Sequence, residues 1–156
     1  MNTVEKLALL RSKMQENNIG AFVVYSADPH LSEYLPKEWL ERAWLSGFTG
    51  SAGFVVITSD KAGLWTDSRY FVQSAIELKG SGIDLFKDGV EGTPDYADWL
   101  VSVLPQGATV AVNALATSHV AWEKLQATLN ANGLKLVHKP LLDTIWTNRE
   151  KDPLHH

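Results

Sequence analysis

The 156 residues, 45% of them hydrophobic and 21% charged, fit one folded domain with a core of its own. Fourteen Lys and Arg against eighteen Asp and Glu give a formal net charge of −4, which argues against a nucleic-acid binder, because phosphate contacts need clustered positive charge. The sequence has no cysteine, so disulfides, thiol nucleophiles and thiolate metal sites are excluded.

The chain begins with a predicted helix over residues 3–17, followed by a buried strand over 21–25. The helix is predicted from apolar residues at three- and four-residue spacing, namely Val4, Leu7, Leu10 and Met14. Asn18 and Gly20 provide its stop. The strand is predicted from a short continuous run of apolar residues. The start of the chain lacks the basic region and long apolar run of a signal peptide, so we expect a cytoplasmic location.

Residues 26–53 are predicted to form a connection with one short helix. Prolines interrupt residues 26–36, a helix is expected over 37–45, and residues 46–53 form a glycine-rich loop. This loop lacks the Walker spacing and the lysine of a phosphate-binding loop, and it leads into a strand rather than a helix. We therefore interpret it as a tight connection in which side chains would clash with a neighbouring backbone.

A hairpin and then alternating helices and strands are predicted for the rest of the chain. The hairpin consists of strands 54–58 and 62–66. The elements expected after it are helix 68–78, strand 83–86, a helix ending before Pro105, strand 109–112, helix 118–131, strand 134–137 and an amphipathic turn at 141–146. The helix before Pro105 has a strong start signal in Thr93-Pro94-Asp95, with the threonine hydroxyl as the expected N-cap.

These elements predict one α/β domain with a mixed sheet of about six strands flanked by helices. The sheet is expected to be mixed because a hairpin precedes the βα repeats. Residues 1–147 are assigned to this domain, and residues 148–156 to a linker or an added tail. Most of the six tryptophans are expected to lie in the core.

The residues alone support few catalytic arrangements. No Gly-x-Ser-x-Gly motif is present, and the histidines show no metal-binding spacing. Asp28 and Asp67 each follow a predicted strand and could hold a divalent ion if those strands were neighbours. Helix capping or turn formation is the alternative role for both residues.

Three motifs occur in a fixed order: His30–Tyr34, Arg42–Gly53 and Leu64–Phe71. In these motifs the sequence resembles the N-terminal domain of the creatinase/prolidase/aminopeptidase P family, with its three-domain cytosolic Xaa-Pro aminopeptidases as the most similar type. The resemblance covers nearly the whole chain. It implies a ribonuclease-H-like α/β fold.

The resemblance also implies a function for a larger parent enzyme, which would release the N-terminal residue that precedes proline. In this family a C-terminal domain holds two metal ions, usually manganese, through two Asp, one His and two Glu, none of which lies in these 156 residues. The chain is therefore expected to carry no catalytic residue, metal ligand or cofactor. Expected partners are the remaining domains, short peptides with proline second and a second full-length copy, but neither nucleic acid nor membrane.

Polar residues of the three motifs are the candidates for contacts at the substrate entrance or between domains: His30, Glu33, Tyr34, Arg42, Asp67, Arg69 and Tyr70. The alternative is an internal salt-bridge network of Arg42, Asp67 and Arg69 that fixes the glycine-rich loop. Under that alternative, Arg69→Ala would unfold the domain. Under the entrance hypothesis it would only raise the KM of the parent enzyme.

The sequence is also compatible with two other functions. A ribonuclease-H-like nuclease could use Asp28 and Asp67 as metal ligands, but no cluster of Lys and Arg accompanies them. An interaction or dimerisation module of a pseudoenzyme would share all the features of this chain, because the deciding metal ligands would lie outside it.

Overall fold

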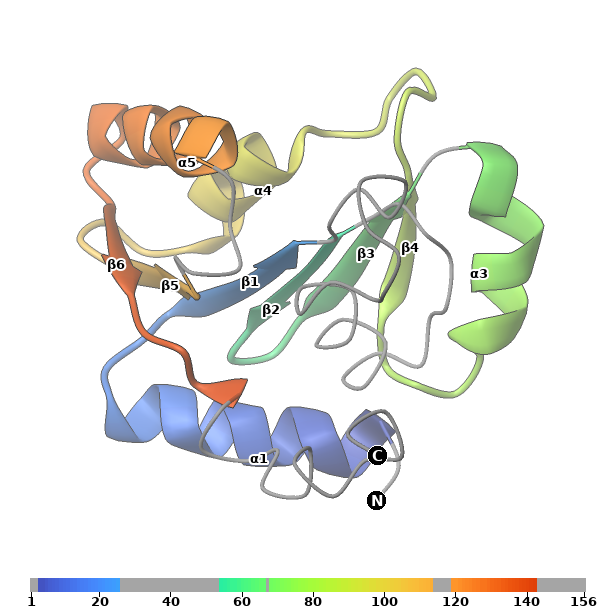
Figure 1. Cartoon of the computed structure of the whole chain (residues 1–156), viewed down its shortest axis with the longest axis horizontal. Coiled ribbons are helices and arrows are strands. Elements are labelled where there is room, and N and C mark those ends of the chain that lie inside the picture. The colour runs from blue at the N-terminus through green and yellow to red at the C-terminus, as the bar shows by residue number, and fades with distance from the viewer. Residues whose placement is uncertain (1–2, 26–53, 67, 114–118, 143–156) are drawn as a thin grey trace, which may run out of the picture.

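The computed structural model describes residues 3–25, 54–66, 68–113 and 119–142, which form one six-stranded sheet with helices on both faces (Figure 1). The strands are β1 (Ala21–Tyr25), β2 (Phe54–Thr58), β3 (Ala62–Thr66), β4 (Asp84–Lys87), β5 (Thr109–Val112) and β6 (Lys135–His138). The helices are α1 (Thr3–Glu16), the 3-10 turn η2 (Ser68–Tyr70), α3 (Phe71–Glu77), α4 (Tyr96–Val103) and α5 (His119–Ala131).

The strands follow the order β4-β3-β2-β1-β5-β6, and only β2 runs against the others. Strand β2 pairs antiparallel with β1 and β3, whereas β1 with β5, β5 with β6, and β3 with β4 are parallel pairs. This confirms the mixed sheet that the predicted hairpin required. It also means that five strands have their carboxyl ends at the same edge.

The sheet is buried on both faces by two hydrophobic clusters. On one face α1 contributes Leu7, Leu10 and Met14, and the end of α3 contributes Leu78. On the other face the helices α4 and α5 cover β1, β5 and β6, chiefly through Leu100, Leu125 and Leu129. Figure 1 shows α1 and the pair α4 and α5 on opposite sides of the strands. None of the described helices is long and apolar enough to cross a membrane.

The predicted bounds of four strands are confirmed, and those of two are shifted by one residue. The predicted strands 83–86 and 134–137 begin with Ile83 and Leu134, which are buried but precede the paired residues. Strand pairing starts only at Asp84, opposite Gly63, and at Lys135, opposite Thr109. The apolar pattern follows the buried residues, which begin one residue before the paired strand. Both predicted strands therefore start and end one residue too early.

The single helix predicted over residues 68–78 is divided into η2 and α3. Tyr70 marks the division, because its φ of −118° and ψ of 9° depart from helical values. Of the four residues whose spacing predicts α1, Leu7, Leu10 and Met14 are buried, whereas Val4 lies in the first turn and is 53% exposed. The predicted helix over 37–45, the glycine-rich loop and residues 143–146 lie outside the described residues.

The N-cap of α4 is Asp95, which corrects the prediction of Thr93. The Asp95 carboxylate accepts a hydrogen bond of 3.1 Å from the backbone N–H of Ala97. The backbone of Asp95 is extended (φ −64°, ψ 144°), and its carbonyl oxygen accepts the bond from the Trp99 N–H. The helix starts two residues later than a cap at Thr93 would require, so the Asp95 carboxylate takes the place of the threonine hydroxyl.

Candidate functional site at the carboxyl edge of the sheet

The carboxyl ends of five strands define one edge of the sheet, which we call the carboxyl edge. The residues that end these strands are Tyr25, Thr66, Lys87, Val112 and His138. In open α/β sheets, ligand-binding groups commonly lie just beyond this edge, on the segments that follow the strands. A functional site of this domain is therefore expected beyond the carboxyl edge.

Both segments that carry predicted site residues start from this edge. Tyr25 ends β1 and pairs with Phe54, the first residue of β2, so the two ends of segment 26–53 are attached at neighbouring positions. Strand β3 lies next to β2 and ends at Thr66, directly before Asp67. The sheet topology therefore brings the attachment points of the three sequence motifs together, as a common site would require.

Five of the seven predicted site residues lie outside the described residues: His30, Glu33, Tyr34, Arg42 and Asp67. The backbone of Arg69 belongs to η2, which begins beside the carboxyl edge. Both the entrance contacts and the salt-bridge network of Arg42, Asp67 and Arg69 stay predictions.

Tyr70 is the predicted site residue that the structure describes in full. It is half-buried and packs against the hydrophobic cluster beneath α1. Its carbonyl oxygen accepts a hydrogen bond of 2.6 Å from the Ser74 hydroxyl, which also donates to the carbonyl of Phe71 at 3.1 Å. Tyr70 therefore has a structural role at the start of α3, and its predicted contact with substrate or another domain stays a prediction.

Two buried polar residues of the carboxyl edge were not singled out from the sequence. Thr66 at the end of β3 is 2% exposed, and Asn113, one residue beyond β5, is 4% exposed. Both residues lie where the chain leaves the sheet, and buried polar groups at such positions are normally hydrogen-bonded. For Asn113 the sequence signal is a polar residue just after an apolar strand, as for Asp28 and Asp67, whereas Thr66 is the last residue of its strand and carries no such signal.

A row of aromatic rings supports the carboxyl edge from the face covered by α4. Phe54, Trp65 and Phe86 occupy paired positions on β2, β3 and β4. Their rings are nearly parallel, with centroids 5.9 Å apart for Phe54 and Trp65 and 4.0 Å apart for Trp65 and Phe86. From α4, Trp99 meets Trp65 edge-on at 5.3 Å and Tyr96 lies 4.4 Å from Phe54. These contacts hold three strand ends in a fixed arrangement.

Trp65 is the centre of this aromatic row and lies in the core as expected, whereas Trp99 and Trp122 are half-buried against the same cluster and the other three tryptophans lie outside the described residues. It is 1% exposed, and its indole N–H donates a hydrogen bond of 2.9 Å to the carbonyl of Pro94. Gly63 makes the close ring contact possible. A Cβ atom at Gly63 would lie 2.6 Å from Phe86 and 2.7 Å from Trp65.

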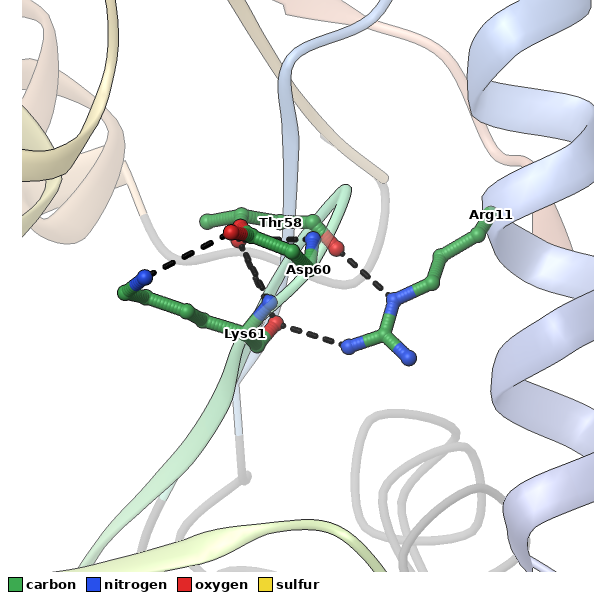
Figure 2. Close-up of polar contacts among 4 residues, drawn as sticks. All are labelled: Arg11, Thr58, Asp60 and Lys61. Carbon is green, nitrogen blue, oxygen red and sulfur yellow. Dashed lines mark hydrogen bonds and ion pairs between the residues drawn. The ribbon is translucent and has the colours of Figure 1, made fainter.

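The opposite edge of the sheet is held by Arg11 of α1, as Figure 2 shows. Its Nε and Nη2 groups donate to the carbonyls of Thr58 and Lys61, at 2.9 and 3.0 Å. Burial lowers the pKa of the Arg11 guanidinium, and the charge of Asp60 acts in the opposite direction.

A cleft of about 600 Å³ lies between α1 and Ser59 of the hairpin turn. The hairpin turn and the carboxyl edge are opposite ends of β2, so this cleft does not lie at the carboxyl edge.

The described residues offer no arrangement that fits a metal ion. Among them, no group of three or more His, Asp or Glu side chains converges. We therefore assign no metal ligand to this part of the chain. Asp28 and Asp67, the metal ligands of the nuclease hypothesis, lie outside the described residues.

Comparison with known proteins identifies the family. Residues 6–144 match the profile of the creatinase/prolidase N-terminal domain. The chain belongs to this family. A protein of Neurospora crassa named probable Xaa-Pro aminopeptidase P is 38% identical over 149 residues, which cover 94% of the chain and 22% of that protein. Aminopeptidase P2 of Arabidopsis thaliana is 38% identical over 154 residues, covering 96% of the chain and 22% of that protein.

Solved structures with the creatinase/prolidase N-terminal domain agree with the fold. An X-prolyl aminopeptidase from Caenorhabditis elegans, described as a cytosolic enzyme with a di-nuclear active site, superimposes with a TM-score of 0.84 at 36% identity. The match covers 96% of the chain and 26% of that enzyme. The N-terminal domain of the cytoplasmic peptidase PepQ from Mycobacterium tuberculosis, crystallised by itself, shares the fold with a TM-score of 0.68 at 18% identity; the match covers 93% of the chain and 98% of that domain.

The chain spans about a quarter of the length of these aminopeptidases. The similarity therefore describes one domain, and the remaining three quarters of each aminopeptidase have no counterpart in the 156 residues.

Proposed function

We propose that this chain is the non-catalytic N-terminal domain of a Xaa-Pro aminopeptidase and that it borders the substrate entrance and contributes to assembly. The observation that carries the proposal is the 38% identity to aminopeptidases over nearly the whole chain, with a match to only 22% of their length. The proposed domain comprises residues 1–147, with residues 148–156 as a linker or tail, and the proposed location is cytoplasmic.

The catalytic chemistry is assigned to the part of the parent enzyme outside these residues. The di-nuclear active site described for the Caenorhabditis elegans enzyme supports two divalent ions, and we propose manganese. Bound ions of this kind activate a nucleophile and stabilise developing negative charge during peptide hydrolysis.

The carboxyl edge gives this domain a means of shaping the entrance. The segments that carry His30, Glu33, Tyr34, Arg42 and Asp67 start from adjacent strand ends, which the buried aromatic row holds in place. A rigid base allows such segments to restrict access to the catalytic centre to short peptides. The net charge of −4 also favours the approach of a positively charged peptide N-terminus.

The test compares peptide hydrolysis by the chain alone, by the complete parent protein and by the parent without residues 1–147. Substrates are a short and a long peptide with proline second, assayed with manganese. We expect no hydrolysis by the chain alone and release of the first residue by the complete parent, with preference for the short peptide. Deletion of the domain is expected to reduce that preference. Hydrolysis by the chain alone, or an inactive parent with manganese bound, would contradict the proposal.

Arg69→Ala distinguishes the two roles that were open for the charged motif residues. A raised KM of the parent enzyme with an unchanged melting temperature of the domain supports contact with the substrate. Loss of the folded domain supports the internal salt-bridge network. The same pair of measurements on Tyr70→Phe tests whether the tyrosine hydroxyl contributes beyond its packing.

A further inference from the structure

Helix α3 presents an apolar stripe to solvent, formed by Val72, Ala75 and Ile76. Val72 is 76% exposed and Ile76 is 70% exposed, which makes them two of the three most exposed large hydrophobic side chains of the described residues. Ala75 is exposed between them. Positions three and four residues apart lie on the same side of a helix, so the three side chains form one continuous surface. We call it the α3 stripe.

The α3 stripe belongs to neither of the two hydrophobic clusters formed by the described residues. The buried side of the helix is provided by Ser74, which is fully buried, and by Leu78, which is 5% exposed. Val and Ile are poorer helix formers than unbranched polar residues, because their χ1 freedom is restricted in a helix. Two such residues in a helix of seven, exposed to water, lower rather than raise the stability of the isolated domain.

Polar groups flank the α3 stripe on the same helix and on the neighbouring strand. The Gln73 amide donates a hydrogen bond of 3.1 Å to the Glu77 carboxylate. The Lys87 ammonium group of β4 lies 5.6 Å from the centre of the Phe71 ring. An apolar centre with a polar rim is the usual composition of a protein interface.

The location of α3 relates the stripe to the proposed entrance. The helix follows η2 directly, and η2 follows the carboxyl end of β3, so Val72 is only two residues from Tyr70. Figure 1 shows α3 at the margin of the molecule, on the far side of β4 from α4 and α5. A domain that packed against the stripe would therefore also lie near the carboxyl edge.

We propose that the α3 stripe packs against an apolar surface of the remaining part of the parent enzyme. Three small and medium-sized side chains supply far less than the roughly 800 Å² per partner that a specific dimer buries, so a second copy of this domain is a poor occupant. A covalently connected domain needs less contact area, because the connection raises its effective concentration. The relatives provide such a partner, since about three quarters of their length lies outside the matched domain.

The proposal rests on the proposed function only in requiring a larger parent protein, and its test does not use peptidase activity. The test measures amide hydrogen exchange of α3 in the chain alone and in the complete parent. Domains of this family crystallise alone, which supports the use of the separate chain. We expect exchange in α3 to be at least about tenfold slower in the parent, because docking suppresses local opening. Equal exchange rates in both proteins would overturn the proposal, whether or not the parent is a peptidase.

A double variant, Val72→Gln with Ile76→Gln, identifies the side chains responsible. In the complete parent it should restore the faster exchange of α3, while the melting temperature of the separate chain stays equal or rises. Val120→Gln is the matched control, because Val120 is a β-branched residue of α5 with 75% exposure. It should leave α3 exchange unchanged. If α3 is protected in the chain alone in proportion to chain concentration, a second copy occupies the stripe and the proposal is wrong.

Discussion

Arg11 connects the first helix to the hairpin turn through two backbone carbonyls that are 47 and 50 residues away in sequence. Removal of its side chain leaves both carbonyls to water and deletes the long-range connection. We expect Arg11→Ala to lower the free energy of unfolding by about 1.5–3 kcal/mol, the range that hydrogen bonds to charged groups contribute. Chemical denaturation of the chain at neutral pH measures the change.

Lys13→Ala is the control for Arg11→Ala on the same helix. Lys13 forms an exposed ion pair with Glu16 at 3.4 Å, and such pairs contribute about 0–1 kcal/mol. Equal effects of the two substitutions would show that charge on α1, rather than the contact with the hairpin, determines the stability.

Asp95 gives a second prediction at this scale, because the sequence favoured Thr93 as the N-cap of α4. Asp95→Ala is expected to lower the free energy of unfolding by about 1 kcal/mol through loss of the bond to the Ala97 N–H. Asp95→Ser should retain most of the stability, since a serine hydroxyl accepts the same bond. Thermal or urea unfolding of Thr93→Ala completes the set. A larger loss for Thr93→Ala than for Asp95→Ala would place the cap at the threonine.

At the residue scale, sequence patterns predict the motif residues but not the buried polar residues Thr66 and Asn113 at the carboxyl edge. His30, Arg42 and Asp67 were noticed because they belong to ordered motifs, and their roles stay predictions. A single polar residue at or directly after the end of a strand is common in sequences, so only the fold shows that Thr66 and Asn113 both lie buried at one edge.

The aromatic row across β2, β3 and β4 depends on the missing side chain of Gly63. Gly63→Ala places a Cβ atom within 3 Å of Phe86 and Trp65, so the rings must separate. We expect a loss of about 1–3 kcal/mol, the usual range for overpacking a core, and an altered near-UV circular dichroism signal of the stacked rings. An unchanged spectrum and stability would contradict the packing described for this half of the sheet.

At the scale of elements, sequence patterns predicted the sheet because its inner strands are short apolar runs between clear turn residues. The bounds of β1, β2, β3 and β5 were correct for that reason. The outer strands β4 and β6 were displaced by one residue, because a buried residue precedes the paired positions in each. The order of strands in space could not be predicted, since it depends on pairings between distant segments.

At the scale of the whole molecule, the chain is one domain of a known family and is proposed to serve a larger enzyme without carrying its catalytic residues. The fold, with its topology and six strands, is that of the creatinase/prolidase N-terminal domain. This domain has a six-stranded sheet, a carboxyl edge from which the motif segments start, and an apolar stripe on α3 that lies outside the two described hydrophobic clusters. These features suit gating and docking within the proposed aminopeptidase.

The most direct measurement for the central claim is the sequence of the parent reading frame beyond the codon for residue 156. We expect the reading frame to continue through a second α/β domain into a third domain that contains two Asp, one His and two Glu as ligands for two metal ions. A frame that ends at this point, or that continues with those ligands replaced, would contradict the aminopeptidase assignment. The chain would then be a binding or scaffolding module that retains the family fold.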